Sequence, residues 1–360
     1  MTIGPAVGPS HDVDLVARIL TQARVDVLAE LEGVFAERRR TGYGPLYDLL
    51  ADYPFREGKG LRPAICLASC RAAGGRTEQA LRSATALELF HNAFLVHDDV
   101  EDGSQFRRGR VTLFEEHGAP VAINVGDATN VLAMEILLGN TDTIGVRKAL
   151  LVFREVERMA RESSEGQAIE LGWIQGGRFD LGDRDYVRMA YKKTCWYTVI
   201  APLRIGVICG SSPGPLAPLD EELQPLIELG FNAGIAFQIH DDLLNLEGDE
   251  TLYGKETSGD LWEGKRTVML LHFMRGAAGS LSERATRLLQ TPRRQKRQAD
   301  VDWLLDAMRE AGSVEHGRQL AVEYCERALE LDAEGFPYLE DNDDRRFLRE
   351  MLRYVIERVK

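Results

Sequence analysis

Apolar residues recur at helical spacing along almost the whole chain. Between Val13 and about Arg40 they fall on one helix face. The same period predicts further helices over about residues 63–73, 77–101, 119–139, 143–164, 166–175, 183–210, 219–246, 265–278, 282–291, 298–312, 314–334 and 343–359. Alternating Val, Ile and Thr runs between tight turns, which would predict strands, are nearly absent. We therefore predict an all-α fold in the form of a single large helical bundle.

The polar and flexible segments give no sign of a division into domains. Residues 1–11 are rich in glycine and proline, and we expect them to be disordered. No shift in composition marks a boundary later in the chain, so we expect one domain over residues 12–360. The basic run Arg293–Arg297 has two interpretations, a docking patch or a solvated connection between two helices.

Composition narrows the class of protein. The 360 residues carry a net charge of −13, which argues against a nucleic-acid-binding surface and against attachment to an anionic membrane. Five cysteines without a CxxC pair are best explained as buried small residues in a reducing compartment. No export signal is recognisable, and no uninterrupted apolar run approaches the ~20 residues of a membrane span. We expect a cytoplasmic protein without an integral membrane segment.

Two short stretches repeat one pattern in different halves of the chain. Residues 94–102 read Phe-Leu-Val-His-Asp-Asp-Val-Glu-Asp, and residues 237–245 read Phe-Gln-Ile-His-Asp-Asp-Leu-Leu-Asn. Each is an apolar helical run that ends in carboxylates, and one helix turn brings Asp102 beside Asp98 and Asn245 beside Asp241. Mg2+ would offset the repulsion between such carboxylates, since it prefers oxygen ligands and shares them with phosphates. The repeat predicts a Mg2+–diphosphate site between facing helices; the alternative is two solvated acidic helix ends.

Cations surround these acidic motifs at informative positions. Lys59 and Arg62 flank a glycine-rich turn before a helix that begins near Pro63, a favourable arrangement for an anion. The pair Arg107-Arg108 follows the first acidic motif closely enough to fold back over a diphosphate. His91 lies two helix turns before Asp98 and therefore on the same face, although a lone helical histidine is more often a core residue.

In this order and spacing, these residues resemble the polyprenyl synthetase family, the trans-isoprenyl diphosphate synthases. The resemblance covers about residues 40–275. The matching segments are Gly58-Lys59-x-x-Arg62-Pro63, Glu88-x-x-His91, Asp98-Asp99-x-x-Asp102, Arg107-Arg108-Gly109, Gly126-Asp127, Gly166-Gln167, Lys193-Thr194, Phe237-Gln238-x-x-Asp241-Asp242, Gly254-Lys255, Asp260 and Gly264-Lys265. The resemblance implies an all-α homodimeric enzyme. It would condense isopentenyl diphosphate with an allylic diphosphate (dimethylallyl, geranyl or farnesyl) to a product longer by one isoprene unit.

The resemblance also implies a role for each matching residue. About three Mg2+ ions would be bound directly by Asp98, Asp102 and Asp241, with Asp99, Asp242, Asn245 and Gln167 in support. The allylic diphosphate would be held by Arg107, Lys193 and Lys255, with Lys265 closing on it. Isopentenyl diphosphate would be held by Lys59, Arg62, His91 and Arg108. Thr194 and Gln238 would stabilise the carbocation or orient the attack.

The chain departs from the family pattern at a few positions. Asn245 stands where Asp is more common, but its amide oxygen can still serve as a ligand. Gly60 replaces a usual basic residue, which predicts slightly weaker diphosphate binding. Val111 and Phe114 replace a usual proline and histidine without a clear consequence.

The residues upstream of Asp98 bear on product length. Phe94 lies about 6 Å before Asp98 along the helix axis and is expected to limit the growing chain. Ala93 is small where shorter-chain members tend to place an aromatic. The combination predicts an intermediate pocket and geranylgeranyl diphosphate as the product, with farnesyl diphosphate as the alternative.

Two other functions stay open at this point. A class I terpene cyclase would share the scaffold and the first acidic motif but would carry a different second metal motif. A non-catalytic subunit of a heteromeric synthase would typically have lost the acidic motifs, which this chain retains.

Overall fold

The structure is a computed structural model that describes residues 12–56, 58–212, 221–247 and 258–357. Residues 1–11 and the Gly254-Lys255 motif therefore lie outside the described residues. The elements are α1 (Val13–Thr41), α2 (Gly44–Phe55), α3 (Leu61–Ala72), α4 (Thr77–Asp102), β1 (Phe106–Arg107), β2 (Arg110–Val111), α5 (Leu113–His117), α6 (Ala119–Leu138), α7 (Asn140–Gln175), α8 (Asp183–Ala190), η1 (Tyr191–Ile200), α9 (Ala201–Gly210), α11 (Pro225–Glu247), α13 (Gly259–Glu263), α14 (Val268–Gly276), α15 (Gly279–Gln290), η2 (Arg293–Gln295), α16 (Gln298–Glu310), α17 (Ser313–Glu334) and α18 (Asp343–Glu357).

The all-α prediction is confirmed, although α2 and α5 were not predicted and three further elements differ locally. A two-stranded antiparallel hairpin pairs Phe106 with Val111 and Arg107 with Arg110, and strands of two residues are too short to leave a sequence pattern. Helix α7 continues through the break predicted near residue 165 and is interrupted at Gly145 instead, where φ is 79°. The helix predicted over 183–210 is continuous but contains a π-helical segment, η1.

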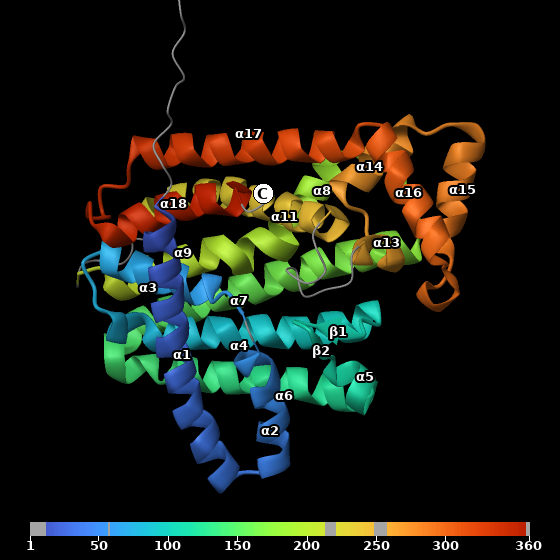
Figure 1. The fold of residues 1–360 in the computed structure, drawn as a ribbon. Helices are drawn as coiled ribbons and strands as arrows, with labels where there is room; N and C mark the ends of the chain where they lie inside the picture. Colours follow the sequence, from blue (N-terminus) through green and yellow to red (C-terminus); the bar gives the residue numbers. More distant parts are fainter. Residues whose placement is uncertain (1–11, 57, 213–220, 248–257, 358–360) are drawn as a thin grey trace, which may run out of the picture.

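Most of the long helices run side by side in a bundle. Figure 1 shows α4, α6, α7, α11 and α17 extending in similar directions, with α1 and α2 crossing near one end and α15 and α16 standing at the other. Helix α4 packs on α6, α11 packs on α17, and η1 lies between α7 and α11. Helix α11 contributes buried residues to both hydrophobic core clusters, with Ala233 in one and Ile239 in the other. The second acidic motif is thus fixed by packing on several sides.

Two glycines allow the helices that carry the site to approach closely. A Cβ atom at Gly166 in α7 would lie 2.2 Å from the backbone nitrogen of Lys193 in η1. A Cβ atom at Gly126 in α6 would lie 2.2 Å from His97 Nε2 in α4. A larger residue at position 166 would therefore force α7 and η1 apart, and one at position 126 would displace the His97 side chain. The two glycines of the matching motifs thus have a packing reason.

Two further expectations can be compared with the structure. All five cysteines are free and buried, which confirms their interpretation as small core residues. Among the described helices, α6 alone is long and apolar enough to pass a membrane-span test on length and composition, with a mean hydropathy of 1.4 and 44% of that window buried inside the protein. Half-buried core helices pass the same test, so this signal is weak.

Candidate active site

A cavity of about 1130 Å³ opens between α4, α7, η1 and α11. Most of the site residues predicted from the sequence line this cavity, although they are spread over more than two hundred positions of the chain. The predicted residues that line it are Lys59, Arg62, His91, Phe94, Asp98, Arg107, Arg108, Gln167, Lys193, Thr194, Gln238, Asp241, Asp242 and Lys265. Ala93, Asp99, Asp102 and Asn245 are not among the lining residues, and Lys255 lies outside the described part of the chain.

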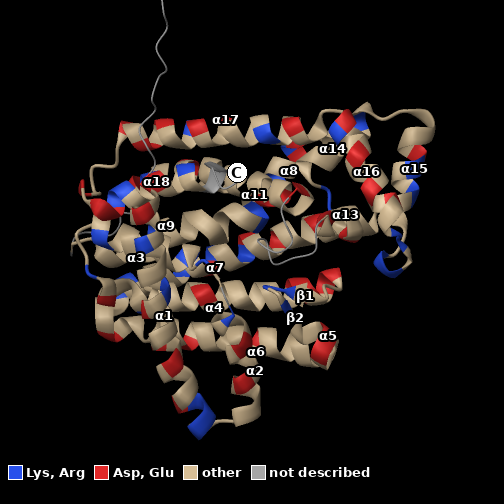
Figure 2. Cartoon of the chain, in the orientation of Figure 1, with Lys and Arg blue, Asp and Glu red and all other residues tan. Residues whose placement is uncertain are grey.

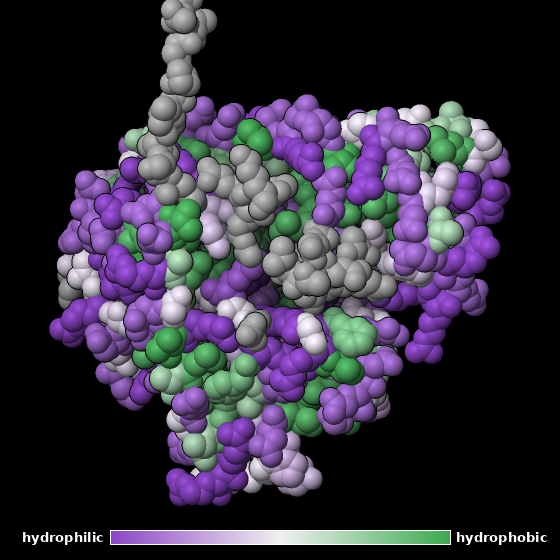
Figure 3. Space-filling model, in the orientation of Figure 1, coloured by the Kyte–Doolittle hydropathy of each residue, from purple (hydrophilic) through white to green (hydrophobic). Residues whose placement is uncertain are grey.

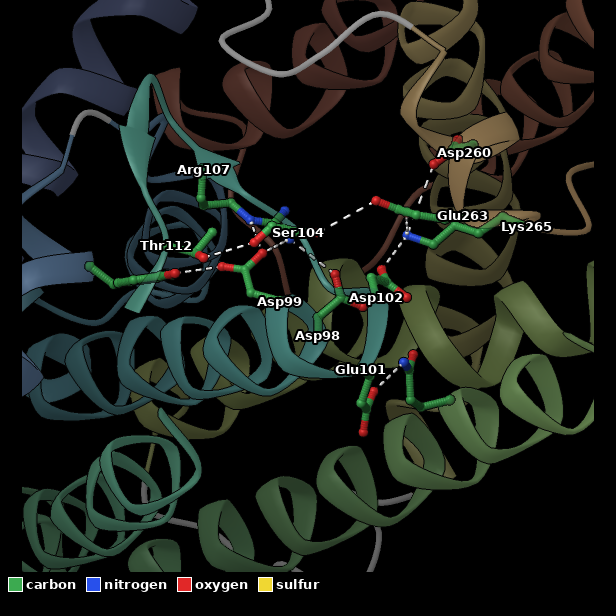
Figure 4. A network of polar contacts seen from close by, with 12 residues as sticks. Asp98, Asp99, Glu101, Asp102, Ser104, Arg107, Thr112, Asp260, Glu263 and Lys265 are labelled. Atoms are coloured by element: carbon green, nitrogen blue, oxygen red, sulfur yellow. Dashed lines mark hydrogen bonds and ion pairs between the residues drawn. The ribbon is translucent and has the colours of Figure 1, made fainter. Parts of the chain in front are cut away.

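The first acidic motif ends α4 at the mouth of this cavity. Figure 4 shows its carboxylates facing cations from the hairpin and from the segment after α13. Asp98 lies 3.2 Å from Arg107 Nη2 and 3.7 Å from Lys193 Nζ, and Asp102 lies 2.7 Å from Lys265 Nζ. Burial raises the pKa of Asp102 to about 8, although Lys265 acts in the opposite direction. This carboxylate therefore depends on nearby positive charge to stay ionised.

Asp99 is turned away from the cavity and is fully buried. It accepts hydrogen bonds from Tyr53 Oη at 2.5 Å and from Arg107 Nε at 2.8 Å. Burial raises the pKa of Asp99, with Arg107 opposing the shift. Arg56 donates to the carbonyl oxygens of Arg107 and Val111 at 3.0 and 2.7 Å, so α2 holds both strands of the hairpin. In this arrangement Asp99 supports the site by orienting Arg107.

The second acidic motif is also held by hydrogen bonds. Asp242 is buried and accepts hydrogen bonds from Tyr186 Oη at 2.7 Å and from Gln238 Nε2 at 2.6 Å. Gln238 in turn accepts from Thr194 Oγ1 at 2.5 Å. Unlike Asp99 in the first motif, Asp242 lines the cavity together with Asp241. Burial raises the pKa of Asp242 well above its usual value, and Asp260 adds to the shift. Asp242 thus fixes the orientation of Gln238 and Thr194.

Asn245 has a local structural contact. Its side-chain oxygen accepts the backbone N–H of Asp260 at 3.0 Å, and its backbone carbonyl accepts from Ser258 at 2.7 Å. Asp260 lines the same cavity. In this conformation Asn245 anchors the start of α13 rather than contributing its oxygen to the cavity.

The chemistry of the donor set fits a hard divalent cation, although among the described residues no three His, Cys, Asp or Glu side chains are grouped closely enough to hold an ion by themselves. Carboxylates of Asp98, Asp241 and Asp260 line one cavity, and the buried Asp102 carboxylate lies beside it under Lys265. Carboxylate oxygens are the ligands that Mg2+ takes in proteins, usually together with substrate phosphates. Burial opposes the charge on Lys193, but Glu170 and Asp98 outweigh this effect and raise the pKa of the ammonium group. This end of the cavity therefore favours positive charge.

A second group of cations lines the cavity around the turn before α3. Arg62 donates to Thr198 Oγ1 at 2.9 Å, and its guanidinium lies 4.3 Å from the ring centre of Tyr197. Arg108, which adopts a left-handed φ of 54°, places Nη2 3.5 Å from His91 Nε2. Burial lowers the pKa of Arg108, and Arg107, Arg62 and Arg24 add to that effect. Positively charged side chains this close together repel one another, and a bound anion would relieve that repulsion. The group is therefore a candidate anion-binding site.

Several residues of this site were not predicted from the sequence. Arg24 of α1 lines the cavity, and a Cβ atom at Gly60 would lie 3.2 Å from its side chain. Glu170 pairs with Lys193, and Glu263 lies 2.9 Å from Lys265. Tyr53 and Arg56 support the hairpin as described above. These residues lie outside the matching motifs, and only the packing of distant helices brings them to the site.

Comparison with known proteins agrees with this geometry. The sequence profile of the polyprenyl synthetase family matches residues 45–308. Geranylgeranyl pyrophosphate synthase of Geoglobus acetivorans is 30% identical over 96% of this chain and 99% of its own length. Octaprenyl diphosphate synthase of Escherichia coli is 31% identical over 76% of this chain and 78% of its own length. The two relatives are named for products of very different length, so similarity does not decide the product.

A solved structure shares the same architecture. Geranylgeranyl pyrophosphate synthase of Corynebacterium glutamicum, determined with isoprenyl diphosphate and magnesium, superimposes with a TM-score of 0.83 at 25% identity. The match covers 95% of this chain and 99% of that one.

Proposed function

Since the chain belongs to the polyprenyl synthetase family and is therefore a prenyltransferase, we propose that it condenses isopentenyl diphosphate with an allylic diphosphate to give geranylgeranyl diphosphate. The observation that carries this proposal is the presence of two separate cation groups in one cavity. One group, with Lys193 and Lys265, meets the acidic motifs, and the other, with Arg62 and Arg108, lies near the turn before α3. Two diphosphate sites suit two substrates, whereas a terpene cyclase needs only one.

The allylic diphosphate belongs at the acidic end. Asp98, Asp102 and Asp241 would hold Mg2+, and we propose about three ions with substrate present. When bound there, Mg2+ would supply positive charge that stabilises the departing diphosphate. Lys193 and Lys265 would add fixed positive charge on either side of the first motif. The metal dependence is a family property, while the identity and number of the ions are proposals.

The carbon–carbon bond would form between the two cation groups. When the allylic C–O bond breaks, positive charge develops on the hydrocarbon. The oxygens of Thr194 and Gln238 line the cavity there, and Asp242 orients them through the Gln238 amide. Their dipoles would stabilise the carbocation until the double bond of isopentenyl diphosphate attacks it. The condensed cation would then lose a proton to the departed diphosphate. No side chain is assigned as the base.

Isopentenyl diphosphate belongs at the other cation group. Lys59, Arg62, Arg108 and His91 come from the sequence prediction, and we add Arg24. At position 60, where the family usually has a basic residue, the glycine lies against the Cβ atom of Arg24, and the Arg24 side chain lines the same cavity. Arg24 would thus compensate for the departure at Gly60.

The cavity lining supports a short product. The Phe94 ring lies in the wall, 5.6 Å from the centre of the Tyr197 ring and edge-on to it, whereas Ala93 is buried in the core. Farnesyl diphosphate is the alternative product.

We also propose a homodimer. Apolar side chains that are exposed by 60% or more lie on α6 and α7, namely Val131, Leu138, Val146 and Leu150. Figure 3 shows apolar surface gathered around α2 and α6. Exposed apolar side chains on neighbouring helices are typical of a protein–protein interface, and covering those on α6 would explain the apolar character of that helix. Residues 12–360 would then act as one domain in a cytoplasmic dimer.

A product assay tests the function. Purified protein is incubated with Mg2+, labelled isopentenyl diphosphate and each allylic starter in turn, and the dephosphorylated products are sized by chromatography. We expect a dominant twenty-carbon alcohol, and no product from the Asp98→Asn variant. A fifteen-carbon alcohol would support the farnesyl alternative. Cyclic hydrocarbon without elongation would support the cyclase and refute the proposal.

A further inference from the structure

The segment that carries Lys265 cannot hold its position by itself. It consists of α13, a helix of only five residues, followed by Gly264 with a left-handed φ of 75°. So short a helix is unstable in isolation, and the carbonyl groups of its last turn have no partners within it. Whatever fixes this segment therefore decides where Lys265 and Asp260 lie relative to the acidic motifs.

A buried lysine from another part of the chain supplies those partners. Lys296, between η2 and α16, is 8% exposed, and its Nζ donates to the carbonyl oxygens of Leu261 at 2.9 Å and Trp262 at 2.6 Å. The basic run Arg293–Arg297 was predicted to be a docking patch or a solvated connection, and both interpretations are wrong for Lys296. Arg294, Gln295 and Arg297 are exposed, as a solvated connection requires, but the Lys296 side chain is buried against α13.

Arg293 extends this contact to the first acidic motif. Its Nη1 lies 3.1 Å from Glu263 Oε1, and the other oxygen of Glu263 lies 2.9 Å from Lys265 Nζ. Lys265 in turn lies 2.7 Å from Asp102. Figure 4 shows Glu263 reaching toward Ser104 on one side and Lys265 on the other. A continuous series of ionic contacts therefore joins η2 to the end of α4.

The other side of the segment is also fixed. Arg266 is 1% exposed, donates to the carbonyl of Gly264, and donates through Nε to the carbonyl of Arg178 at 2.9 Å. Its guanidinium lies 4.2 Å from the ring centre of Phe179. Figure 2 shows acidic residues at the end of α4 that lies next to the hairpin. The segment is thus held between Arg266 on one side and Lys296 on the other.

Burying the ammonium group of Lys296 is costly. Burial lowers its pKa to about 8, and Arg293 and Arg266 add to the shift. An apolar side chain of the same length would fill this space without that cost. A charge kept there against this cost indicates that its two hydrogen bonds to α13 matter for more than packing.

We propose that Lys296 and Arg293 are positioning residues, through which the α15–α16 region holds Lys265 and Asp260 in place for the allylic diphosphate. This inference rests on the proposed function for its kinetic consequence. It also gives the region beyond residue 280 a role in the reaction, although that region lies outside the cavity.

The test compares Lys296→Met with a matched control, Arg294→Met, two residues away and exposed. The first readout is amide hydrogen exchange of residues 259–265, followed also by the fluorescence of Trp262, and it needs no activity. We expect roughly tenfold faster exchange in this segment for Lys296→Met and no change for the control, because two hydrogen bonds to a charged donor are lost.

The second readout is kinetic. We expect kcat to fall about tenfold while KM for isopentenyl diphosphate stays unchanged, because that site lies at the other cation group.

Unchanged exchange in Lys296→Met would overturn the proposal, and so would faster exchange throughout the protein. If Lys296→Met does not fold, Lys296→Arg and Glu263→Gln replace it. We expect Lys296→Arg to retain slow exchange because it keeps the charge and the donors, and Glu263→Gln to lower kcat without increasing exchange at Leu261 and Trp262. Fast exchange in Lys296→Arg or full activity in Glu263→Gln would refute the proposed positioning role of Lys296 and Arg293. Absence of prenyl transfer in the unmodified protein would refute the proposed function but leave the exchange result to decide the anchoring.

Discussion

Replacing Arg24 with methionine is the sharpest test of how this chain binds isopentenyl diphosphate. Arg24 is half-buried in α1 and lines the cavity beside Gly60. The structure gives its Nη2 one contact, the carbonyl oxygen of Arg56 at 3.3 Å. Methionine keeps the length and apolar stem of the side chain, so α1 should remain in place while the positive charge is lost.

The magnitude follows from the surroundings of Arg24. A hydrogen bond to a charged group contributes roughly 1.5–3 kcal/mol. Arg24 is only half-buried and three other cations remain, so we expect the loss to fall near the lower limit, about 1–2 kcal/mol. This corresponds to roughly a 5–30-fold weaker binding of isopentenyl diphosphate.

The assay separates the two substrates. Steady-state kinetics give KM for isopentenyl diphosphate and for the allylic starter, and calorimetry gives direct affinities, because KM equals Kd only when chemistry is slow. Arg18→Met is the control, since Arg18 lies on the same helix but pairs with Asp343 at 3.2 Å on the surface. We expect the rise in KM to be confined to isopentenyl diphosphate and to Arg24→Met. An unchanged KM, or an equal rise for both substrates, would refute the placement of Arg24.

Three further predictions concern product length, stability and pH. Phe94→Ala should shift the products toward longer chains because it removes a ring from the cavity wall, and an unchanged product spectrum would exclude this role for Phe94. Tyr53→Phe should lower the free energy of unfolding by about 1.5–3 kcal/mol in urea titrations, because the buried Asp99 loses a hydrogen bond; a change below about 0.5 kcal/mol would contradict this. Burial, and then His316, lower the pKa of His272 below 6.5. The unfolded chain therefore binds a proton there first, and stability should fall as the pH drops from about 7 toward 5. His272→Asn should show a smaller fall, and an equal fall would contradict the assignment.

The sequence by itself determined the helices and the candidate residues. A helix is encoded by residues three or four positions apart, so α1, α4 and α17 could be predicted to within a few residues. Each acidic motif is likewise a local pattern on one helix. The matching glycines could be recognised as well, although their packing reason, such as that of Gly166 against Lys193, became visible only in the structure.

Tertiary structure decided which of these residues face the cavity and which support it. Asp98 and Asp99 are neighbours in sequence, yet Asp99 is withdrawn because Tyr53, 46 positions away, donates a hydrogen bond to it. Asp242 lines the cavity, but its carboxylate is oriented by Tyr186, 56 positions away, which donates a hydrogen bond to it. From the sequence, Lys296 would be expected at the surface, but in the structure α13 covers it. Such contacts depend on how remote helices pack, and the spacing of residues along one helix carries no information about that packing.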